Sequence, residues 1–335
     1  MTPEQLLGLT AGFQTSCAVM AACELDLFSA IVDRGSADPE TLAKALDLDG
    51  RGFSYLLAAL ASLDLLEIDD GKYRVPEALK PFLDSRSPRS VVPMIRHQAN
   101  CARGWSQLAW TLKNGVPVPD VAGVNGALVE FQDFVLAMNV VANRLAPKIA
   151  DSLRNVGLLD FERMLDLGGA SGTYSFEFLA KNPNPSAKAV LFDRPAAIEE
   201  AKIKAKTALR GDSVEFYPGD FYVDPYPTDV DFVWISAIIH QQDDDATQTM
   251  FRKSFDALRP GGAIAVRDVY IRDDQTGPKA AAFFGLNMTV RTLKGKVYSA
   301  RETISALEKA GFQNARLAIP ADDMSAVVAA QKPAD

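Results

Sequence analysis

Cysteine and histidine are both scarce in this chain. The three cysteines, Cys17, Cys23 and Cys101, are odd in number, and none forms the C-x-x-C spacing of metal or redox pairs. They are therefore interpreted as reduced, buried thiols, as is usual in a cytoplasmic protein, and no disulfide framework is expected. The only histidines are His97 and His240. His97 lies in a predicted helix, where a lone histidine is usually structural.

Positive charge and long apolar runs are also limited. Lysine and arginine total 35 against 43 acidic residues, which gives a net charge of −8 in 335 residues. This balance argues against binding to nucleic acid and against attachment to a membrane through positive charge. No apolar run approaches about 18 residues, and the N-terminus has no basic segment, so we expect neither a signal peptide nor a membrane span. The length predicts two domains.

The most informative stretch is Met164–Gly172, a short apolar run that ends in an acid and opens into a glycine-rich turn. A helical pattern follows over Thr173–Lys181. Together these segments predict a buried parallel strand, a tight turn and a helix, which form the first βα unit of a doubly wound sheet. The glycines let the main chain bend sharply and leave room for a ligand against bare backbone.

The spacing of this turn points to one class of ligand. A dinucleotide fingerprint that began at Gly168 would need glycine at the position of Ala170. Acids instead flank the turn: Asp166 precedes it, and Asp193 closes the next apolar run, where a ribose-binding acid belongs. An acid repels phosphate but suits a ribose or a cationic amino-acid tail. This favours S-adenosylmethionine over NAD, and the alternative is a turn that only joins a strand to a helix.

The first 95 residues show a winged-helix pattern. Recurring apolar residues predict a helix over about 4–32, further helices are predicted at Pro39–Leu46 and Arg51–Leu63, and a hairpin is predicted around Asp69–Lys72. The first helix is apolar on more than one side, which indicates burial against another chain. DNA binding is the alternative, but a phosphate-binding surface needs several basic residues on one face. The second helix carries Arg51 without a basic stripe, and the hairpin tip is acidic. We interpret residues 1–95 as a dimerisation domain.

Residues 96–152 are expected to be a helical linker that contributes to a substrate pocket. The predicted helices are Met94–Lys113 and Ala127–Ser152. Candidates to line the pocket are Trp105, Trp110, Phe131, Phe134 and Met138. Such residues at helical spacing more often belong to a core, and we favour that interpretation for most of them.

From residue 160 onward strands and helices alternate, which predicts an α/β fold for a cofactor-binding catalytic domain over residues 153–335. The sheet is expected to be doubly wound, mostly parallel, seven-stranded and Rossmann-like. Its last two strands, Ala315–Ile319 and Ser325–Ala330, form an antiparallel edge hairpin. The predicted strands before them are Arg163–Leu167, Ala189–Phe192, Ser213–Tyr217, Asp231–Ile235 and Ala263–Arg267, and the further predicted helices are Pro195–Leu209, Asp244–Leu258 and Ala300–Ala310.

Ligands bind such sheets at the carboxyl ends of the strands. The candidate residues there are Gly168, Asp193, Asp220, Ser236, His240 and Asp268. The acidic run Asp243–Asp245 could suggest a metal site. Acids that open a helix are favoured as N-caps and by the helix dipole, so we interpret the run as a helix start and expect no metal.

Five motifs, in order, resemble one family. They are Leu165–Gly172, Phe192–Pro195, Gly219–Phe221, Ile238–His240 and Leu258–Gly262. With the winged-helix pattern before them, they resemble the class I S-adenosylmethionine-dependent O-methyltransferases of the plant caffeate and hydroxyindole type and their bacterial relatives. The resemblance covers nearly the whole chain and implies a homodimer.

The resemblance also implies roles for individual residues. Gly168 and Gly169 would pass under the methionine part of S-adenosylmethionine, Asp193 would hold the ribose hydroxyls, and Asp220 and Phe221 would flank the adenine. Ser236 occupies a position that often contacts the cofactor. His240 matches the general base, and Asp268 matches the carboxylate behind it. Asn287 and Met288 resemble substrate contacts. S-adenosylhomocysteine would be the product.

Two departures from the plant pattern keep alternatives open. Gln241 and Gln242 follow the histidine where plant members have Asp-Trp, and Val297 replaces a second catalytic acid. We predict a cytoplasmic methyltransferase that acts on a small aromatic or quinone-like acceptor, most readily at a hydroxyl. The alternatives are C-, N- or S-methylation, or a winged-helix regulator that binds the cofactor without catalysis. The acceptor, the methylated atom and the pathway stay open.

Overall fold

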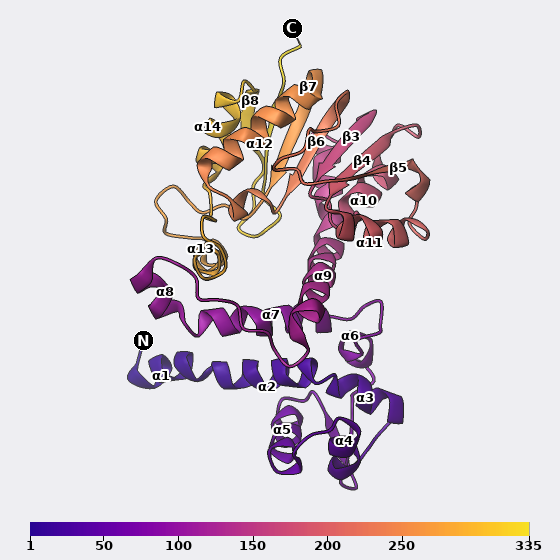
Figure 1. The fold of residues 1–335 in the computed structure, drawn as a ribbon, viewed down its shortest axis with the longest axis vertical. Coiled ribbons are helices and arrows are strands. Elements are labelled where there is room, and N and C mark those ends of the chain that lie inside the picture. Colours follow the sequence, from indigo (N-terminus) through magenta and orange to yellow (C-terminus); the bar gives the residue numbers. More distant parts are fainter. Residues whose placement is uncertain (335) are drawn as a thin grey trace. The chain divides into compact units, whose positions relative to one another are not determined.

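The computed structural model describes residues 1–334 and divides the chain into two compact units. The helical unit comprises residues 1–106 and 119–140, and the sheet unit comprises residues 107–118 and those from 141 onward. The long helix α9 (Gly126–Asn155) contributes to both units (Figure 1). The three-part domain division proposed from the sequence, with boundaries at 95 and 152, stays a prediction.

The helical unit contains the predicted hairpin and the helices predicted at Pro39–Leu46 and Arg51–Leu63. Besides the first part of α9, its elements are α1 (Pro3–Ala11), α2 (Phe13–Glu24), α3 (Leu27–Arg34), α4 (Pro39–Ala45), α5 (Gly50–Ser62), β1 (Glu67–Asp69), β2 (Lys72–Arg74), α6 (Lys80–Leu83) and α7 (Val92–Trp105). The Asp38 carboxylate caps α4 by accepting from the Thr41 backbone N–H, as the sequence predicts. Phe28, Leu57 and Leu60 are among the fully buried residues of its core. The single helix predicted over Met94–Lys113 is two helices, and residues 107–118 belong to the sheet unit.

The predicted single helix over residues 4–32 is three helices. Asp26 adopts a left-handed backbone with φ of 52°, which ends the run between α2 and α3. Helix α1 buries none of its residues, and Leu7 and Phe13 are 68% and 64% exposed. By length and composition alone, Pro3–Glu24 could cross a membrane. The expectation that no apolar segment reaches this size was wrong, because Pro3–Glu24 contains only two charged residues, Glu4 and Glu24, so that its mean hydropathy is high although its apolar residues are not consecutive.

The sheet unit has the predicted seven-stranded sheet. Its strands are β3 (Arg163–Leu167), β4 (Lys188–Asp193), β5 (Val214–Pro218), β6 (Val230–Ser236), β7 (Leu258–Arg267), β8 (Gln313–Ile319) and β9 (Val327–Gln331). They lie in the order β5-β4-β3-β6-β7-β9-β8, with β9 antiparallel to both of its neighbours and every other pairing parallel. The doubly wound fold and its antiparallel edge are therefore confirmed.

Two hydrophobic cores cover the two faces of this sheet. Helix α10 (Thr173–Lys181), α11 (Pro195–Ala205) and the end of α9 cover one face, around Trp234 and Phe178. Helices α12 (Asp244–Ala257) and α14 (Ala300–Lys309) cover the other, around Phe251. Figure 1 shows the helices on either side of the strands. The remaining helices of the unit are α8 (Leu108–Asn114), α13 (Lys279–Arg291) and two 3-10 turns, η1 (Gly211–Ser213) and η2 (Ile239–Gln241).

Candidate active site

The carboxyl ends of the parallel strands bring the predicted cofactor residues to one edge of the sheet. Strands β4 and β6 end at Asp193 and Ser236, and Asp268 directly follows β7. Leu167 of β3 pairs with Ile235 of β6, so that the glycine turn begins beside Ser236. The edge is therefore formed by segments far apart in the sequence, as the alternation of strands and helices predicts.

The glycine turn has a backbone that side chains would obstruct. Gly168 and Gly172 have φ of 70° and 75°, and Ala170 between them also has a positive φ of 47°. A Cβ on Gly168 would lie 2.6 Å from Ile238 Cδ1, and one on Gly169 would lie 2.7 Å from the Asp166 carboxyl carbon. The turn therefore presents bare main chain at the sheet edge.

Asp193 is held by this turn. One carboxylate oxygen accepts from the Ala170 N–H at 2.8 Å, and the other accepts from the Arg194 N–H at 2.7 Å. Burial raises the pKa of Asp193, and the two backbone hydrogen bonds oppose that rise. Each oxygen has a second lone pair, so the carboxylate could still accept from a pair of vicinal hydroxyls.

Asp166 faces the interior instead. It is 1% exposed and accepts from the Ser175 hydroxyl at 2.7 Å. Burial raises its pKa to about 7. Near neutral pH this group therefore carries less negative charge than the sequence argument assumed, and the acidic character of the turn rests mainly on Asp193.

A half-buried lysine that the sequence analysis did not single out also adjoins the turn. The Lys204 ammonium on α11 donates to Thr173 Oγ1 at 2.6 Å, at the start of α10. Burial lowers its pKa to about 8. No periodicity marks Lys204 as special, because its environment depends on how three helices pack.

Asp220 and Phe221 follow β5 in a tight turn. The Asp220 carboxylate accepts from the Tyr222 N–H at 2.9 Å. The Phe221 ring is 8% exposed, packs edge-on to Phe192, and lies 3.4 Å from the position of a Gly168 Cβ. Phe221 is therefore next to the glycine turn, whereas the Asp220 carboxylate is only partly buried.

His240 and Asp268 form a buried pair. His240 lies in η2, just after β6, and its Nδ1 is 2.9 Å from both oxygens of Asp268. The exposed fractions are 6% for His240 and 1% for Asp268. A carboxylate can only accept, so Nδ1 donates and Nε2 is left as an acceptor. Phe284 of α13 packs edge-on to the imidazole, with the ring centroids 4.8 Å apart.

The predicted substrate contacts come from different parts of the chain. Met138 is a half-buried residue of α9 within the helical unit. Asn287 and Met288 lie on α13 of the sheet unit, where Met288 is 6% exposed. Their role as substrate contacts stays a prediction.

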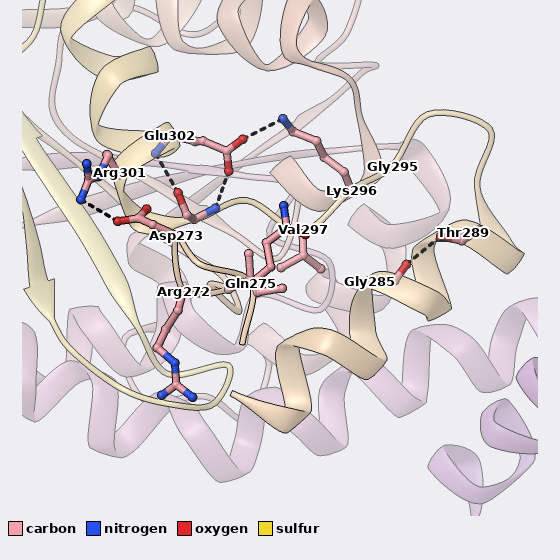
Figure 2. A pocket seen from close by; sticks show the side chains of 12 residues that line it. Arg272, Asp273, Gln275, Gly285, Thr289, Gly295, Lys296, Val297, Arg301 and Glu302 are labelled. Carbon is pink, nitrogen blue, oxygen red and sulfur yellow. Dashed lines mark hydrogen bonds and ion pairs between the residues drawn. The ribbon is translucent and has the colours of Figure 1, made fainter. Parts of the chain in front are cut away.

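A cavity of about 710 Å³ lies beside α13, but it is not formed by the predicted site residues. Figure 2 shows Val297, at the position of the missing second acid, among the residues that line it. Its charged walls are largely paired: Arg301 contacts Asp273 at 2.8 Å and Lys296 contacts Glu302 at 3.2 Å.

The acidic run at 243–245 opens α12, as predicted. The Asp243 carboxylate accepts from the Ala246 N–H at 3.0 Å and pairs with Lys294 at 2.7 Å. Asp244 pairs with Lys296 at 2.8 Å. Within residues 1–334 there is no group of three or more His, Cys, Asp or Glu side chains that could hold a metal ion.

Comparisons with known proteins agree with this architecture. An O-methyltransferase domain matches residues 121–313, and an O-methyltransferase dimerisation domain matches residues 7–79. The chain is 28% identical to a 3-hydroxy-5-methyl-1-naphthoate 3-O-methyltransferase of Streptomyces sahachiroi, over 94% of this chain and 90% of that protein. It is 29% identical to the tetracenomycin polyketide synthesis 8-O-methyl transferase TcmO of Streptomyces glaucescens, over 94% and 92%.

Solved structures give the same result. The human N-acetylserotonin methyltransferase in complex with S-adenosylmethionine superimposes with a TM-score of 0.83, at 26% identity, over 99% of this chain and 98% of that one. The resemblance drawn from the five sequence motifs is thereby confirmed. The chain belongs to the O-methyltransferase family, whose methyl donor is S-adenosylmethionine, and it carries that family's dimerisation domain.

Proposed function

We propose that this enzyme transfers a methyl group from S-adenosylmethionine to a hydroxyl group of a small aromatic acceptor, with His240 as the general base. The observation that carries the proposal is the buried His240–Asp268 pair, held at 2.9 Å at the same sheet edge as the glycine turn. The pair supplies a proton acceptor, and the turn supplies a place for the cofactor.

The residues at the sheet edge fit S-adenosylmethionine. Bare backbone at Gly168 and Gly169 permits close approach of a ligand, and Asp193 can accept from two ribose hydroxyls. The Phe221 ring beside the turn offers an apolar surface for a base. When bound, the cofactor supplies a methyl group on a positively charged sulfur.

The chemistry required of the protein is positioning and removal of one proton. A phenol has a pKa of about 10 and is a weak nucleophile until it is deprotonated. His240 Nε2 would accept the hydroxyl proton as the acceptor oxygen takes the methyl group that the bound cofactor would supply. The Asp268 carboxylate fixes the ring tautomer and stabilises the imidazolium that results.

The relatives support an aromatic acceptor. Two of them are named for O-methylation of a hydroxynaphthoate and of a tetracenomycin polyketide, and the human protein is named for N-acetylserotonin. We extend from these names only the class of acceptor, a hydroxyl on an aromatic ring. Met138, Asn287 and Met288 are the side chains we propose to contact it.

We further propose that the enzyme is a homodimer. The dimerisation domain matches residues 7–79, and α1 within a single chain leaves its apolar side chains in water. Leu7 of α1 and Phe13, the first residue of α2, are both more than 60% exposed. Burial of such side chains against a second copy would be favourable by about 25 cal/mol per Å².

Calorimetric titration with S-adenosylmethionine, S-adenosylhomocysteine and NAD tests the cofactor part of this proposal. We expect both adenosyl compounds to bind and NAD not to bind. Replacing Asp193 with asparagine should weaken binding by about 10- to 100-fold, the value of a charge-assisted hydrogen bond. The matched control is Asp212→Asn in η1, where the side chain is exposed. Absence of binding by either adenosyl compound would refute the proposal.

A further inference from the structure

One charged side chain at the sheet edge is buried without a counter-ion. Arg267, the last residue of β7, is 3% exposed. Its Nε donates to the Met324 carbonyl and its Nη1 donates to Ser236 Oγ at 2.8 Å. Its Nη2 has no hydrogen-bond partner, and no carboxylate within the described chain pairs with the guanidinium. A buried cation without a counter-ion destabilises the folded chain unless a ligand supplies the missing negative charge and hydrogen-bond acceptor.

Two further buried polar side chains belong to the same cluster. The guanidinium is 5.6 Å from the centroid of the Tyr174 ring, and that ring is 5.3 Å from the ring of Trp234. The Trp234 indole N–H has no partner among residues 1–334. Burial raises the pKa of Tyr174, whereas its hydroxyl lies next to the Ser236 hydroxyl, which opposes that rise. Two unsatisfied donors, Arg267 Nη2 and the Trp234 indole N–H, therefore belong to the same cluster as Ser236.

The position of the cluster on the sheet indicates which part of a bound cofactor it would contact. Successive strand residues point to opposite faces of a sheet. Arg267 and Ser236 share the face of Trp234 and Ala265, covered by α10, whereas Asp268 is the next residue and lies with the His240 pair. The acceptor hydroxyl must approach His240. Arg267 therefore faces away from the proton transfer and toward the glycine turn and the start of α10.

We propose that Arg267, acting directly and through the Ser236 hydroxyl, holds the α-carboxylate of the methionine part of S-adenosylmethionine. Arginine can only donate, so Ser236 Oγ accepts from it and is left to donate its own proton outward. The carboxylate is the only negative charge on the cofactor and matches a buried, uncompensated cation. No side chain caps α10, so its positive end adds to the same attraction.

This inference rests on the proposed placement of the cofactor at the sheet edge, and it makes Arg267 a specificity determinant for the amino-acid tail. It predicts discrimination between two ligands that differ only in the carboxylate. S-adenosylhomocysteine has this group, whereas its decarboxylated analogue keeps the adenosine, the thioether and the amine. The wild-type enzyme should bind the first about 10- to 100-fold more tightly.

The test is calorimetric titration of both ligands into the wild type, Arg267→Met and Arg267→Lys. Arg259→Met is the matched control, because Arg259 lies near the other end of β7 in partly exposed ion pairs. Arg267→Met should weaken S-adenosylhomocysteine by about 10- to 100-fold and leave the analogue unchanged, and Arg267→Lys should recover part of the difference. Arg259→Met should change neither affinity.

Three results would overturn the proposal. One is equal binding of the two ligands by the wild type, which needs no variant and stands even where Arg267→Met does not fold. Another is an equal loss of both affinities in a folded Arg267→Met, which indicates a structural role alone. The third is unchanged discrimination in that variant. Failure of the wild type to bind either ligand would instead refute the proposed function itself.

Discussion

Replacing Asp268 with asparagine should slow methyl transfer, and the whole effect should arise from the change at His240. Both carboxylate oxygens lie 2.9 Å from His240 Nδ1, and the carboxylate is 1% exposed. Asparagine has the same shape but no charge. If its NH₂ group faces Nδ1, the ring proton moves to Nε2, and the nitrogen that should accept the acceptor's proton is blocked.

The contacts set limits on the size of the effect. A hydrogen bond to a charged group contributes about 1.5–3 kcal/mol, and one between neutral groups contributes about 0.5–1.5 kcal/mol. Loss of the charge alone therefore costs about 1–2 kcal/mol in the transition state, or about 5- to 30-fold in kcat. A complete change of tautomer removes the base, and the loss then reaches the roughly 10²- to 10⁴-fold expected for His240→Ala.

A double-mutant cycle is the appropriate assay. Methyl transfer to a phenol is measured at saturating S-adenosylmethionine for the wild type, Asp268→Asn, His240→Ala and the double variant. Because Asp268 acts only through the imidazole, the double variant should be no slower than His240→Ala. The control is Asp273→Asn, which should not change kcat. The Asp273 carboxylate pairs with Arg301 at the cavity in Figure 2.

Additive losses would refute this reasoning. If Asp268→Asn slows the enzyme by the same factor with and without His240, the carboxylate acts on something other than the imidazole. Thermal unfolding of each variant separates this result from a loss of folded protein.

Three further predictions concern the turn, the buried acid and the first helix. Gly168→Ala should abolish cofactor binding and lower thermal stability, because φ is 70° and a Cβ would lie 2.6 Å from Ile238 Cδ1; unchanged calorimetric affinity would contradict this. Burial raises the pKa of Asp166 from 3.8 to about 7, so the folded chain keeps a proton that the unfolded chain releases. In denaturant titrations, the free energy of unfolding of the wild type should therefore fall relative to that of Asp166→Asn as the pH rises from about 4 to 7, by roughly 2–4 kcal/mol in total. Above about pH 7 the difference between the two free energies should stay constant. Leu7→Asp in α1 combined with Phe13→Asp at the start of α2 should convert the dimer to monomer in sedimentation experiments, and an intact dimer would exclude this exposed N-terminal surface from the interface.

Most of the sheet could be predicted because its strands are buried on both faces. Strand β3 and helix α10 begin and end where the sequence places them, since an apolar run, a glycine turn and a helical pattern leave little choice. Helix α13 was not predicted. It lacks a side-chain cap, and its residues Ala281–Gly285 show no clear helical periodicity.

Some of the site residues could likewise be predicted from the sequence, and others could not. Asp193, Ser236 and His240 end or directly follow apolar strands and could be predicted from that position. The Asp268 pairing was implied by the family resemblance, and the structure places it at 2.9 Å. Arg267 was missed, although a charged residue that ends an apolar strand is a visible signal. Its missing counter-ion depends on side-chain packing, which no periodicity describes.

Methyl transfer itself tests the central claim most directly. The enzyme is incubated with S-adenosylmethionine labelled in its methyl group and with matched aromatic acceptors that carry a hydroxyl, a thiol or an amine, and the products are identified by mass spectrometry. We predict a labelled methyl ether from the hydroxyl acceptor, and a loss of about 10²- to 10⁴-fold in its rate for His240→Ala. Labelling of the thiol or amine without the hydroxyl, or full activity of His240→Ala, would contradict the account.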